Sequence, residues 1–432
     1  MFRNSVLKIR DFRNLWLAQA TSQFGDAFYI WIFIYMVDQI TKNPVTVGYM
    51  GVLEGIPFLL FSPLAGVAAD RIDRKKIMRW ADLASFAWLM ILAATVFLLK
   101  TPPIWLLFLS GFSLSTINTF FMPAKGALIP QLVPKEKLME ANGLSAATQN
   151  MMPLIGMGLS GGGLVIVQKL YPDLFFPIAI FLNALTFLGS AYFVSKLPTL
   201  RIPRTEEESH DHIGAIIKDA KDGLKYVCSK KVLKVAFGMQ TALFLLTSLY
   251  MTTYITINRV RFGGGFNTLA LMEVMQGAAV VIASLIVAKI AFKKVSKPYI
   301  WGLIFSGGNI VGMALSQNFW YFLSFNAIAG FAFPFCEVPL STYIQMAVPN
   351  EVLGRVNSLL TMITMGITPI GAFFAGHIIK TIGPGNVFAF MGVGLIITAL
   401  VGLSIREFRE ELMPTEQADQ KEETSELQLA TQ

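Results

Sequence analysis

The feature that most constrains the fold is a series of long apolar segments that runs along the whole chain. Each is long enough to cross the hydrocarbon core of a bilayer, which takes about 20 helical residues. Membrane strands would be about ten residues long with alternating hydrophobicity, a pattern that these segments lack. The sequence therefore predicts an all-α polytopic membrane protein with 12 transmembrane helices, near residues 14–38, 45–68, 80–99, 104–124, 143–168, 174–195, 232–256, 267–291, 298–316, 319–343, 356–379 and 386–405.

Composition supports a lipid environment. Hydrophobic residues make up 54% of the 432 residues and charged residues 14%, whereas a soluble domain carries about 25% charge. This argues against a soluble enzyme, a nucleic-acid-binding domain, a disulfide-stapled secreted protein and a disordered chain. The net charge of +8 is accounted for by Lys and Arg lying against anionic lipid headgroups, so membrane lipid is an expected partner and nucleic acid is not. With 2 Cys and 3 His, no metal site or cofactor is expected.

Basic residues also predict the orientation of the chain. If the N-terminus is cytoplasmic, the outer loops hold only six of the 35 Lys and Arg residues. These are Lys42, Lys100, Lys169, Arg259, Arg261 and Lys380. Positive charge accumulates on the cytoplasmic side of membrane proteins, so both termini are placed in the cytoplasm of a multi-pass protein of the cell membrane.

The segment 196–231 divides the spans into two groups of six. It contains an acidic run and then an amphipathic helical pattern, which predicts a cytoplasmic linker with a helix lying at the membrane surface. The expected organisation is a six-helix bundle over 1–195, the linker, a second six-helix bundle over 232–405, and a disordered cytoplasmic tail over 406–432.

The two bundles resemble each other in sequence. VPKEKLMEANGL at 133–144 aligns with VPNEVLGRVNSL at 348–359, an offset of 215, with six of twelve positions identical. Several transporter folds are built from duplicated halves of this kind. The repeat therefore indicates two pseudo-symmetric bundles.

The loop after the second span carries a family resemblance. It reads GVAADRIDRKK at 66–76 and resembles the G-x-x-x-D-R-x-G-R-K/R loop of the major facilitator superfamily, with Asp73 in place of the glycine. The macrolide-efflux and enterobactin-exporter branch is similar in this variant and in three further pieces: FRNLWLAQATSQFGD (12–26), FMPAKGALIPQLV (121–133) and IGMGLSGGG (155–163). The resemblance implies two bundles that rock around a central cavity, usually proton-driven export, and a bacterial inner membrane. Because the cavity would lie within one chain, a monomer is expected.

Two groups of residues in these motifs are candidates for mechanical roles in transport. Gly66, Asp70, Arg71, Arg74 and Lys75 form a candidate cytoplasmic latch, in which carboxylate–guanidinium pairs hold the halves together in one state. The alternative is that the basic residues only fix topology and bind headgroups. Gly156, Gly158, Gly161 and Gly162 are candidates for close and sliding helix packing; ordinary tight packing is the alternative.

Two acidic residues lie deep in the predicted spans. Asp26 is about 18 Å and Glu54 about 14 Å from the outer end of its span. Ionisable groups at such depth are costly and mark functional sites by default. Both residues are candidates to face one aqueous cavity and to bind a proton or a cationic substrate. The alternative for each is a structural hydrogen bond between spans.

Lys125 and Glu337 occupy similar heights near the inner ends of the fourth and tenth spans. They are a candidate gate pair across the cytoplasmic mouth; the alternative is two side chains that extend toward the interface. Asp82 lies close to the basic inner loop and is expected to pair there.

No catalytic constellation and no phosphate-binding G-x-x-x-x-G-K-[ST] loop occurs in the chain, so an enzyme and an ATP-driven pump are not expected. The leading hypothesis is a secondary transporter that exports a bulky organic compound, such as a drug, a macrolide-like compound or a siderophore, in exchange for protons. The alternative is a lysophospholipid or metabolite facilitator of the same fold without proton antiport.

Overall fold

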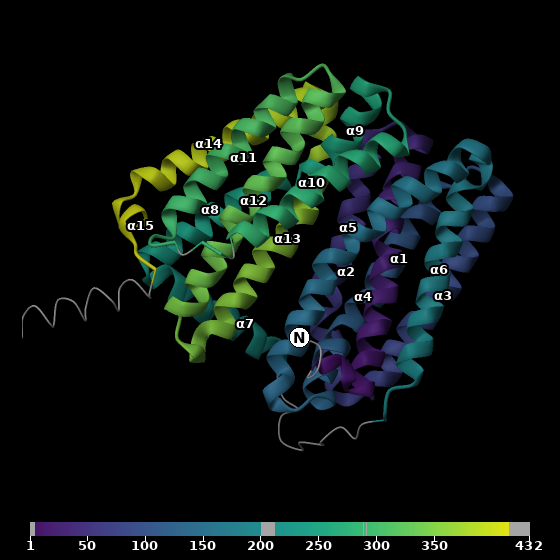
Figure 1. Ribbon diagram of the computed structural model, residues 1–432, viewed down its shortest axis with the longest axis horizontal. Helices are drawn as coiled ribbons and strands as arrows, with labels where there is room; N and C mark the ends of the chain where they lie inside the picture. The colour runs from purple at the N-terminus through teal and green to yellow at the C-terminus, as the bar shows by residue number, and fades with distance from the viewer. Residues whose placement is uncertain (1–4, 200–211, 288, 291, 414–432) are drawn as a thin grey trace, which may run out of the picture. The chain divides into compact units, whose positions relative to one another are not determined.

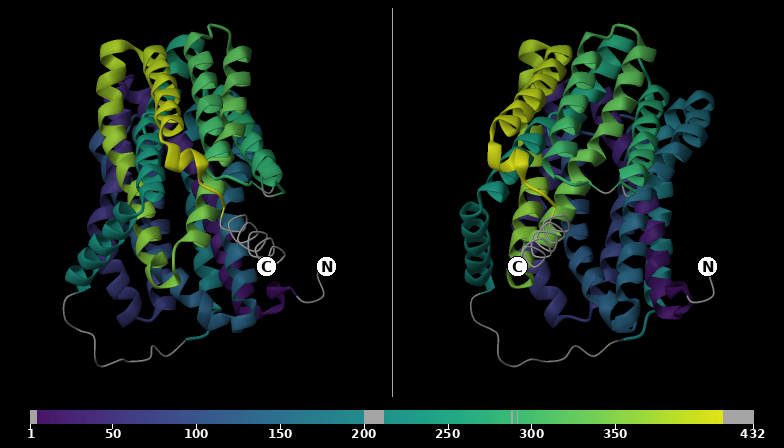
Figure 2. Two further views of the ribbon diagram at one scale, coloured as in Figure 1. Left: turned by 90° about the vertical axis from the view of Figure 1, so that its left-hand side faces the viewer. Right: turned by 60° about the vertical axis from the view of Figure 1, so that its left-hand side comes forward.

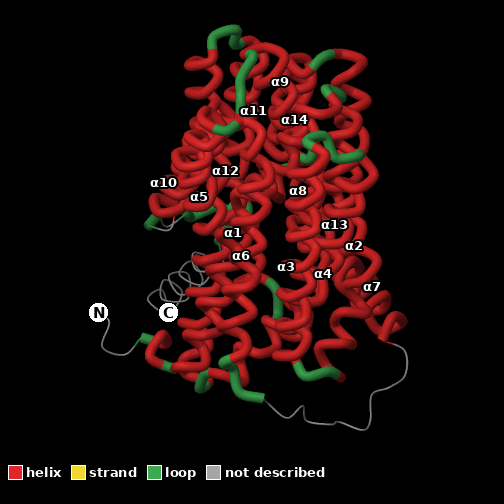
Figure 3. The backbone as a smooth tube through the Cα atoms, turned by 90° about the vertical axis from the view of Figure 1, so that its right-hand side faces the viewer, coloured by secondary structure: helices red, strands yellow, loops and turns green. Residues whose placement is uncertain are grey.

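The computed structural model describes residues 5–199, 212–287, 289–290 and 292–413. These residues are almost entirely helical, and they contain no strand beyond one isolated bridge between Lys294 and Leu412. The backbone trace in Figure 3 shows helices joined by short loops. In the first half the helices are α1 (Arg10–Thr41), α2 (Pro44–Arg71), α3 (Arg74–Leu99), α4 (Ile104–Leu132), α5 (Leu138–Leu170) and α6 (Phe175–Ser195), with short 3-10 turns η1 (Val6–Lys8), η2 (Lys135–Lys137) and η3 (Pro172–Leu174).

The second half begins with the amphipathic helix α7 (His212–Ser229). The remaining helices are α8 (Lys231–Thr247), α9 (Tyr250–Phe262), α10 (Phe266–Val287), α11 (Ser296–Leu315), α12 (Phe319–Ala347), α13 (Asn350–Ile382), α14 (Pro384–Ser404) and α15 (Arg406–Glu410). Figure 1 labels them along the chain.

Ten segments of the described residues are long and apolar enough to cross a membrane. α8 and α9 count together as one of these segments, while α1 and α5 are not among the ten. The all-α membrane fold predicted from the sequence is confirmed. The exact count of twelve spans stays a prediction. The helices described above are consistent with it.

The chain forms two compact units. The first contains Met1–His212 together with Gly264–Val274, and the second contains Ile213–Gly263 together with Met275–Gln432. In the first unit, α1 packs against α5 and α6, α3 against α6 and α4, and α2 against α4. In the second, α11 packs against α12 and α14, and α8 against α13 and α14.

Local chemistry explains where the first helices begin. The Asn43 side chain accepts a hydrogen bond from the Val45 backbone N–H, and Pro44 takes the first helical position of α2. Asp73 caps α3 in the same way by accepting from Lys75 N–H at 3.0 Å. Side-chain oxygens at this position satisfy amide groups that have no partner within the helix. Asp73, which departs from the usual glycine of the loop motif, is therefore the start signal of α3.

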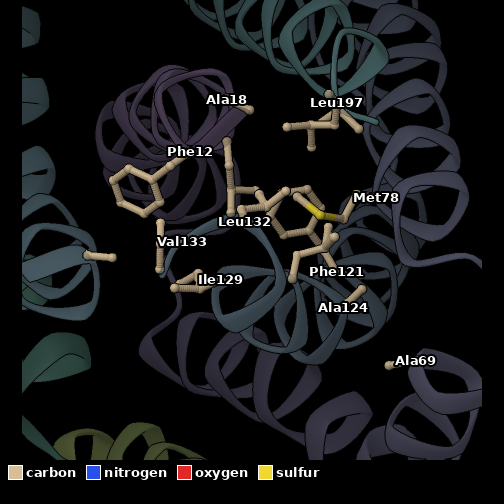
Figure 4. Packing of buried hydrophobic residues seen from close by; sticks show 14 of the residues in the cluster. Phe12, Ala18, Ala69, Met78, Phe121, Ala124, Ile129, Leu132, Val133 and Leu197 are labelled. Atoms are coloured by element: carbon tan, nitrogen blue, oxygen red, sulfur yellow. The ribbon is translucent and has the colours of Figure 1, made fainter. Parts of the chain in front are cut away.

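A dry core fills one end of the first unit. Phe12 and Leu15 of α1 pack there with Met78 of α3, Phe121 and Leu128 of α4, and their neighbours. Figure 4 labels Phe12, Met78 and Phe121 among the side chains from separate helices that form this cluster. Because lipid tails are as apolar as these side chains, the cluster holds the helices through close packing rather than through exclusion of water.

In the second unit, α7 packs beside the start of α13. A Cβ on Gly223 would lie 3.0 Å from the Arg355 carbonyl oxygen, and Arg355 Nη1 lies 3.8 Å from Asp222 Oδ2. The views in Figure 2 show α7 beside the N-terminal end of α13. The predicted amphipathic linker helix is thus present, and it docks on its own unit.

One sequence prediction needs correction at the C-terminal end. Residues 406–413 were expected to belong to a disordered tail, but they are ordered. Phe408 of α15 is fully buried, Ser296 Oγ donates to the Arg409 carbonyl at 2.8 Å, and Met413 N–H donates to the Lys293 carbonyl at 2.9 Å. The rest of the predicted tail, 414–432, lies outside the described residues.

Candidate functional site

A cavity of about 350 Å³ lies inside the first unit. Its volume falls in the range of small-molecule sites, roughly 300–1,000 Å³. Every helix from α1 to α6 contributes to its wall. The lining residues are Gln19, Ser22, Gln23, Asp26, Tyr29, Ile30, Phe33, Glu54, Ala81, Asp82, Ser85, Gly111, Leu114, Ser115, Ile117, Asn118, Phe121, Met122, Gln149 and Phe187.

The two deep carboxyl groups singled out in the sequence both line this cavity. Asp26 follows Arg10, the first residue of α1, by 16 positions, about 24 Å along the helix. Glu54 precedes Arg71, the last residue of α2, by 17 positions, about 26 Å. Since these two helix ends lie on the same side of the unit, the carboxyl groups lie at similar heights on neighbouring helices.

Asp82 of α3 is a third carboxyl group in the same cavity. It is only 1% exposed, and its Oδ2 accepts a hydrogen bond from Ser190 Oγ of α6 at 2.7 Å. It makes no ion pair with any described residue. The expectation that Asp82 pairs with the basic inner loop is therefore wrong, because α3 turns this side chain into the bundle.

Hydroxyl and aromatic groups complete the wall. Tyr29 stacks on Phe33 with ring centroids 5.1 Å apart, and its buried hydroxyl has no hydrogen-bond partner among the described residues. Both Glu54 and Asp26 lie close enough to act on this hydroxyl electrostatically. The Ser115 hydroxyl donates to the backbone carbonyl of Glu54, which ties α4 to α2 at this level.

The charges of the wall have one sign. Among the described residues, three carboxyl groups line the cavity, and no Lys, Arg or His does. The described residues hold no group of three His, Cys, Asp or Glu side chains close enough to bind a metal ion. The acids are therefore spread over the wall instead of converging on one point, an arrangement that suits an organic cation or protons.

The candidate latch residues make contacts within the first unit. Arg74 Nε donates to the Ala69 carbonyl at 3.0 Å and Nη1 to the Ala127 carbonyl at 2.9 Å, while Lys75 Nζ donates to the Leu197 carbonyl. These bonds tie together α2, α4 and the end of α6. Arg71 is exposed and Gly66 is half-buried. The side chain of Asp70 lies outside the described residues, so the latch stays a prediction.

The candidate gate residues belong to different units. Lys125 is only 5% exposed and makes no hydrogen bond or ion pair with a described residue. Glu337 Oε1 accepts from Gln240 Nε2 at 2.6 Å, and Gln240 Oε1 accepts from the Tyr299 hydroxyl at 2.7 Å. Their pairing stays a prediction. Of the packing glycines, Gly156 is buried; the surroundings of Gly158, Gly161 and Gly162 lie outside the described residues.

Ser190 and Tyr29 are site residues that sequence reasoning missed. A serine or tyrosine in an apolar span carries no charge to draw attention. Ser190 is separated from Asp82 by 108 positions, so only the packed bundle brings the two together. For Tyr29 a signal was available, because it follows Asp26 by three positions and therefore shares its helix face.

Comparison with known proteins agrees with this architecture. Macrolide efflux protein A of Streptococcus pyogenes is 26% identical over 409 residues, which cover 92% of this chain and 96% of that protein. The putative bacilysin exporter BacE of Bacillus amyloliquefaciens is 27% identical over 80% of this chain and 83% of its own length. A crystal structure of a bacterial homologue of the iron transporter ferroportin, in an inward-facing state, has the same fold, with a TM-score of 0.68, 15% identity, and coverage of 92% of this chain and 100% of that one.

The family model described as transmembrane secretion effector matches residues 4–431. This match spans nearly the whole chain and includes all six helices that build the cavity. The chain therefore belongs to the transmembrane secretion effector family of major facilitator transporters.

Proposed function

We propose that this transporter exports a bulky organic cation across a bacterial cell membrane in exchange for protons. The observation that carries the proposal is the cavity, whose described lining includes three carboxyl groups and no basic residue. The names of two relatives, a macrolide efflux protein and a putative bacilysin exporter, support export of an organic compound.

The acidic cavity wall favours one of the substrate classes that the sequence predicts. A carboxylate in a low-dielectric wall attracts a cation far more strongly than it would in water, and the same field repels an anion. A positively charged drug or macrolide-like compound therefore suits this wall better than an anionic siderophore. Phe33, Phe121 and Phe187 supply flat apolar surface, and a cation gains further from an aromatic face.

Exchange follows from the same groups. Asp26 and Glu54 supply negative charge to a wall that either a proton or the positive charge of the substrate neutralises, so binding of one weakens binding of the other. Rocking of the two halves would then expose the loaded wall to one side and the emptied wall to the other. In this proposal the latch at Gly66, Asp70, Arg71, Arg74 and Lys75 and the gate pair Lys125–Glu337 hold the end states of that motion. Both termini lie in the cytoplasm, and one chain is the transport unit.

The first test is proton movement in everted membrane vesicles that hold a pH gradient. A panel of macrolides, tetracycline, cationic dyes and catecholate siderophores is added to vesicles with the wild type, Asp26→Asn, Glu54→Gln, or Asp173→Asn. Asp173 forms an exposed ion pair with Lys100 far from the cavity lining, so its variant is the matched control. A cationic compound is expected to dissipate the gradient with the wild type and with Asp173→Asn.

Asp26→Asn and Glu54→Gln are expected to lower this response by about tenfold or more, because each removes a carboxylate that the exchange requires. If both variants keep full proton-coupled export, the assignment of these residues is wrong. If no compound responds in the wild type, with the protein present and folded, proton antiport is excluded for the panel and the lysophospholipid or metabolite facilitator becomes the better account.

A further inference from the structure

Asp82 differs from the other two acids of the cavity. Its side chain is 1% exposed, whereas Asp26 and Glu54 are half-buried. It follows Arg74, the first residue of α3, by 8 positions, which places it about 12 Å along the helix. Asp26 and Glu54 lie at about 24 and 26 Å from the same end of the unit. The cavity thus holds its acids at two levels.

The hydrogen bonds of Asp82 do not suit a permanent carboxylate. Oδ2 accepts one bond from Ser190 Oγ at 2.7 Å, and Oδ1 is buried with no hydrogen-bond partner among the described residues. A buried carboxylate normally needs a cation or several donors, since removing the bare charge from water is costly. A proton on Oδ1 removes this cost.

In the part of the chain that the structure describes, no neighbouring cation offsets the charge of Asp82. Around the cavity, α1 contributes Asp26 and the Tyr29 hydroxyl, and α2 contributes Glu54, while α4, α5 and α6 contribute no charged side chain to the wall. Lys125 of α4 is buried outside this lining. Arg79, three positions before Asp82 on α3, is exposed and forms no ion pair with a described residue. Asp26, which lines the same cavity, supplies a second acidic group and not a counter-charge.

We infer that Asp82, held by Ser190, is the proton-binding residue of this transporter, and that Asp26 and Glu54 bind the positive charge of the substrate at the other level of the cavity. The inference deepens the proposed function and rests on it for the substrate, but not for the proton. When Asp82 releases its proton, the wall gains one negative charge and binds the cation more tightly. By thermodynamic linkage, protonation of Asp82 weakens cation binding by the same factor.

The first experiment tests whether Asp82 is protonated, and it needs no substrate. Infrared spectra of the purified protein in lipid nanodiscs record the C=O stretch of protonated carboxyl groups at neutral pH. The wild type is expected to show a band that disappears in Asp82→Asn and persists in Asp26→Asn and in the control Asp173→Asn. In Ser190→Ala the band should move to higher frequency, because the hydrogen bond to the carboxyl group is lost. A band that survives in Asp82→Asn, or does not move in Ser190→Ala, overturns the inference.

Coupling is tested with tetraphenylphosphonium, a permanent cation that carries no proton of its own. Its affinity for the wild type is expected to rise with pH, by up to about tenfold per pH unit, the slope for release of one proton. Asp82→Asn should bind with an affinity independent of pH, whereas Asp26→Asn should bind more weakly and keep the slope. A slope that persists in Asp82→Asn overturns the inference. Absence of binding by the wild type contradicts the proposed substrate class and leaves the infrared result to decide on Asp82.

Discussion

At the scale of single residues, Glu140 holds the N-terminal segment on the first unit. It precedes the apolar span of α5, and its Oε1 accepts from the Val6 backbone N–H at 2.9 Å while Oε2 lies 3.1 Å from Lys137 Nζ. The Val6 N–H, and then Lys137, hold the pKa of this carboxyl group below its usual range. The hydrogen bond from Val6 therefore stabilises the ionised form of Glu140 and is weakened when Glu140 is protonated.

A pH dependence follows from the sign of this shift. A group whose pKa is lowered by folding contributes its stability above its unfolded pKa, and the contribution is lost as pH falls through the folded pKa. At neutral pH, Glu140→Gln is expected to speed hydrogen exchange of the Val6 amide relative to the wild type, because this amide loses its carboxylate acceptor. As the pH falls below the lowered pKa, Val6 is released in the wild type too, and the difference should vanish.

The same hydrogen exchange is measured in Glu136→Gln, whose side chain is exposed one turn earlier. In this control the Val6 amide should exchange as in the wild type at every pH. A difference between Glu140→Gln and the wild type that is independent of pH would show that Val6 is held by packing rather than by the carboxylate.

The sequence predicts a site residue when the residue's own helix reveals its role, and it fails when the role depends on a partner from a distant helix. Asp26 and Glu54 are identified by depth alone, because a charge in the middle of an apolar span is visible without a structure. Asp82 is not, because its place in the sequence beside Arg74, Lys75 and Arg79 suggests a surface ion pair. Its true partner comes from α6, and only the packing of α3 on α6 sets that contact.

At the scale of elements, α11 and α14 cross at a pair of glycines. A Cβ on Gly307 would lie 2.6 Å from the Gly392 carbonyl oxygen, and one on Gly392 would lie 2.5 Å from the Gly307 carbonyl oxygen. Small residues at such a crossing let two backbones approach in a membrane. Because the opposing atoms belong to helix backbone, they cannot turn aside as a flexible side chain would.

Gly392→Ala is therefore expected to lower the free energy of unfolding by about 1–3 kcal/mol, the usual cost of overpacking. The measurement is thermal unfolding in detergent, followed by intrinsic fluorescence. Gly308→Ala is the matched control, since its Cβ would meet nothing within 4 Å and alanine favours the helix. Equal unfolding temperatures for the two variants would show that the crossing tolerates a methyl group.

The elements themselves are largely predictable, because apolar length and helix caps are local. The break in the seventh span is not. α8 ends at Thr247 and α9 begins at Tyr250, and no Gly or Pro lies between 239 and 262 to indicate it. A Cβ on Gly371 of α13 would collide with Ser248, so the bend lies where another helix approaches closely. Likewise the order of 406–413 depends on α15 packing against Tyr299 through Phe408.

At the scale of the whole molecule, the duplication is visible in how each half is anchored. Glu140 and Arg355 occupy equivalent positions of the internal repeat, 215 residues apart. Glu140 binds Val6, just before α1, and Arg355 contacts Asp222 of α7, just before α8. The residues differ in charge while the place of the contact is kept. Each half therefore fixes the segment that enters its first helix at the start of its fifth.

Lys125 is buried and has no partner among the described residues of its own unit, and a buried cation of this kind needs a counter-charge at some stage of the cycle. If Glu337 supplies it, as the sequence predicts, Lys125→Met and Glu337→Gln should each slow transport, and the double variant should be no slower than either one. The coupling energy from the transport rates is then about 0.5–3 kcal/mol. Lys125→Met combined with Glu411→Gln, which removes the carboxylate bonded to Tyr343, is the control pair and should be additive. Additive effects in the Lys125–Glu337 cycle as well would show that the two residues act independently and that the gate lies elsewhere.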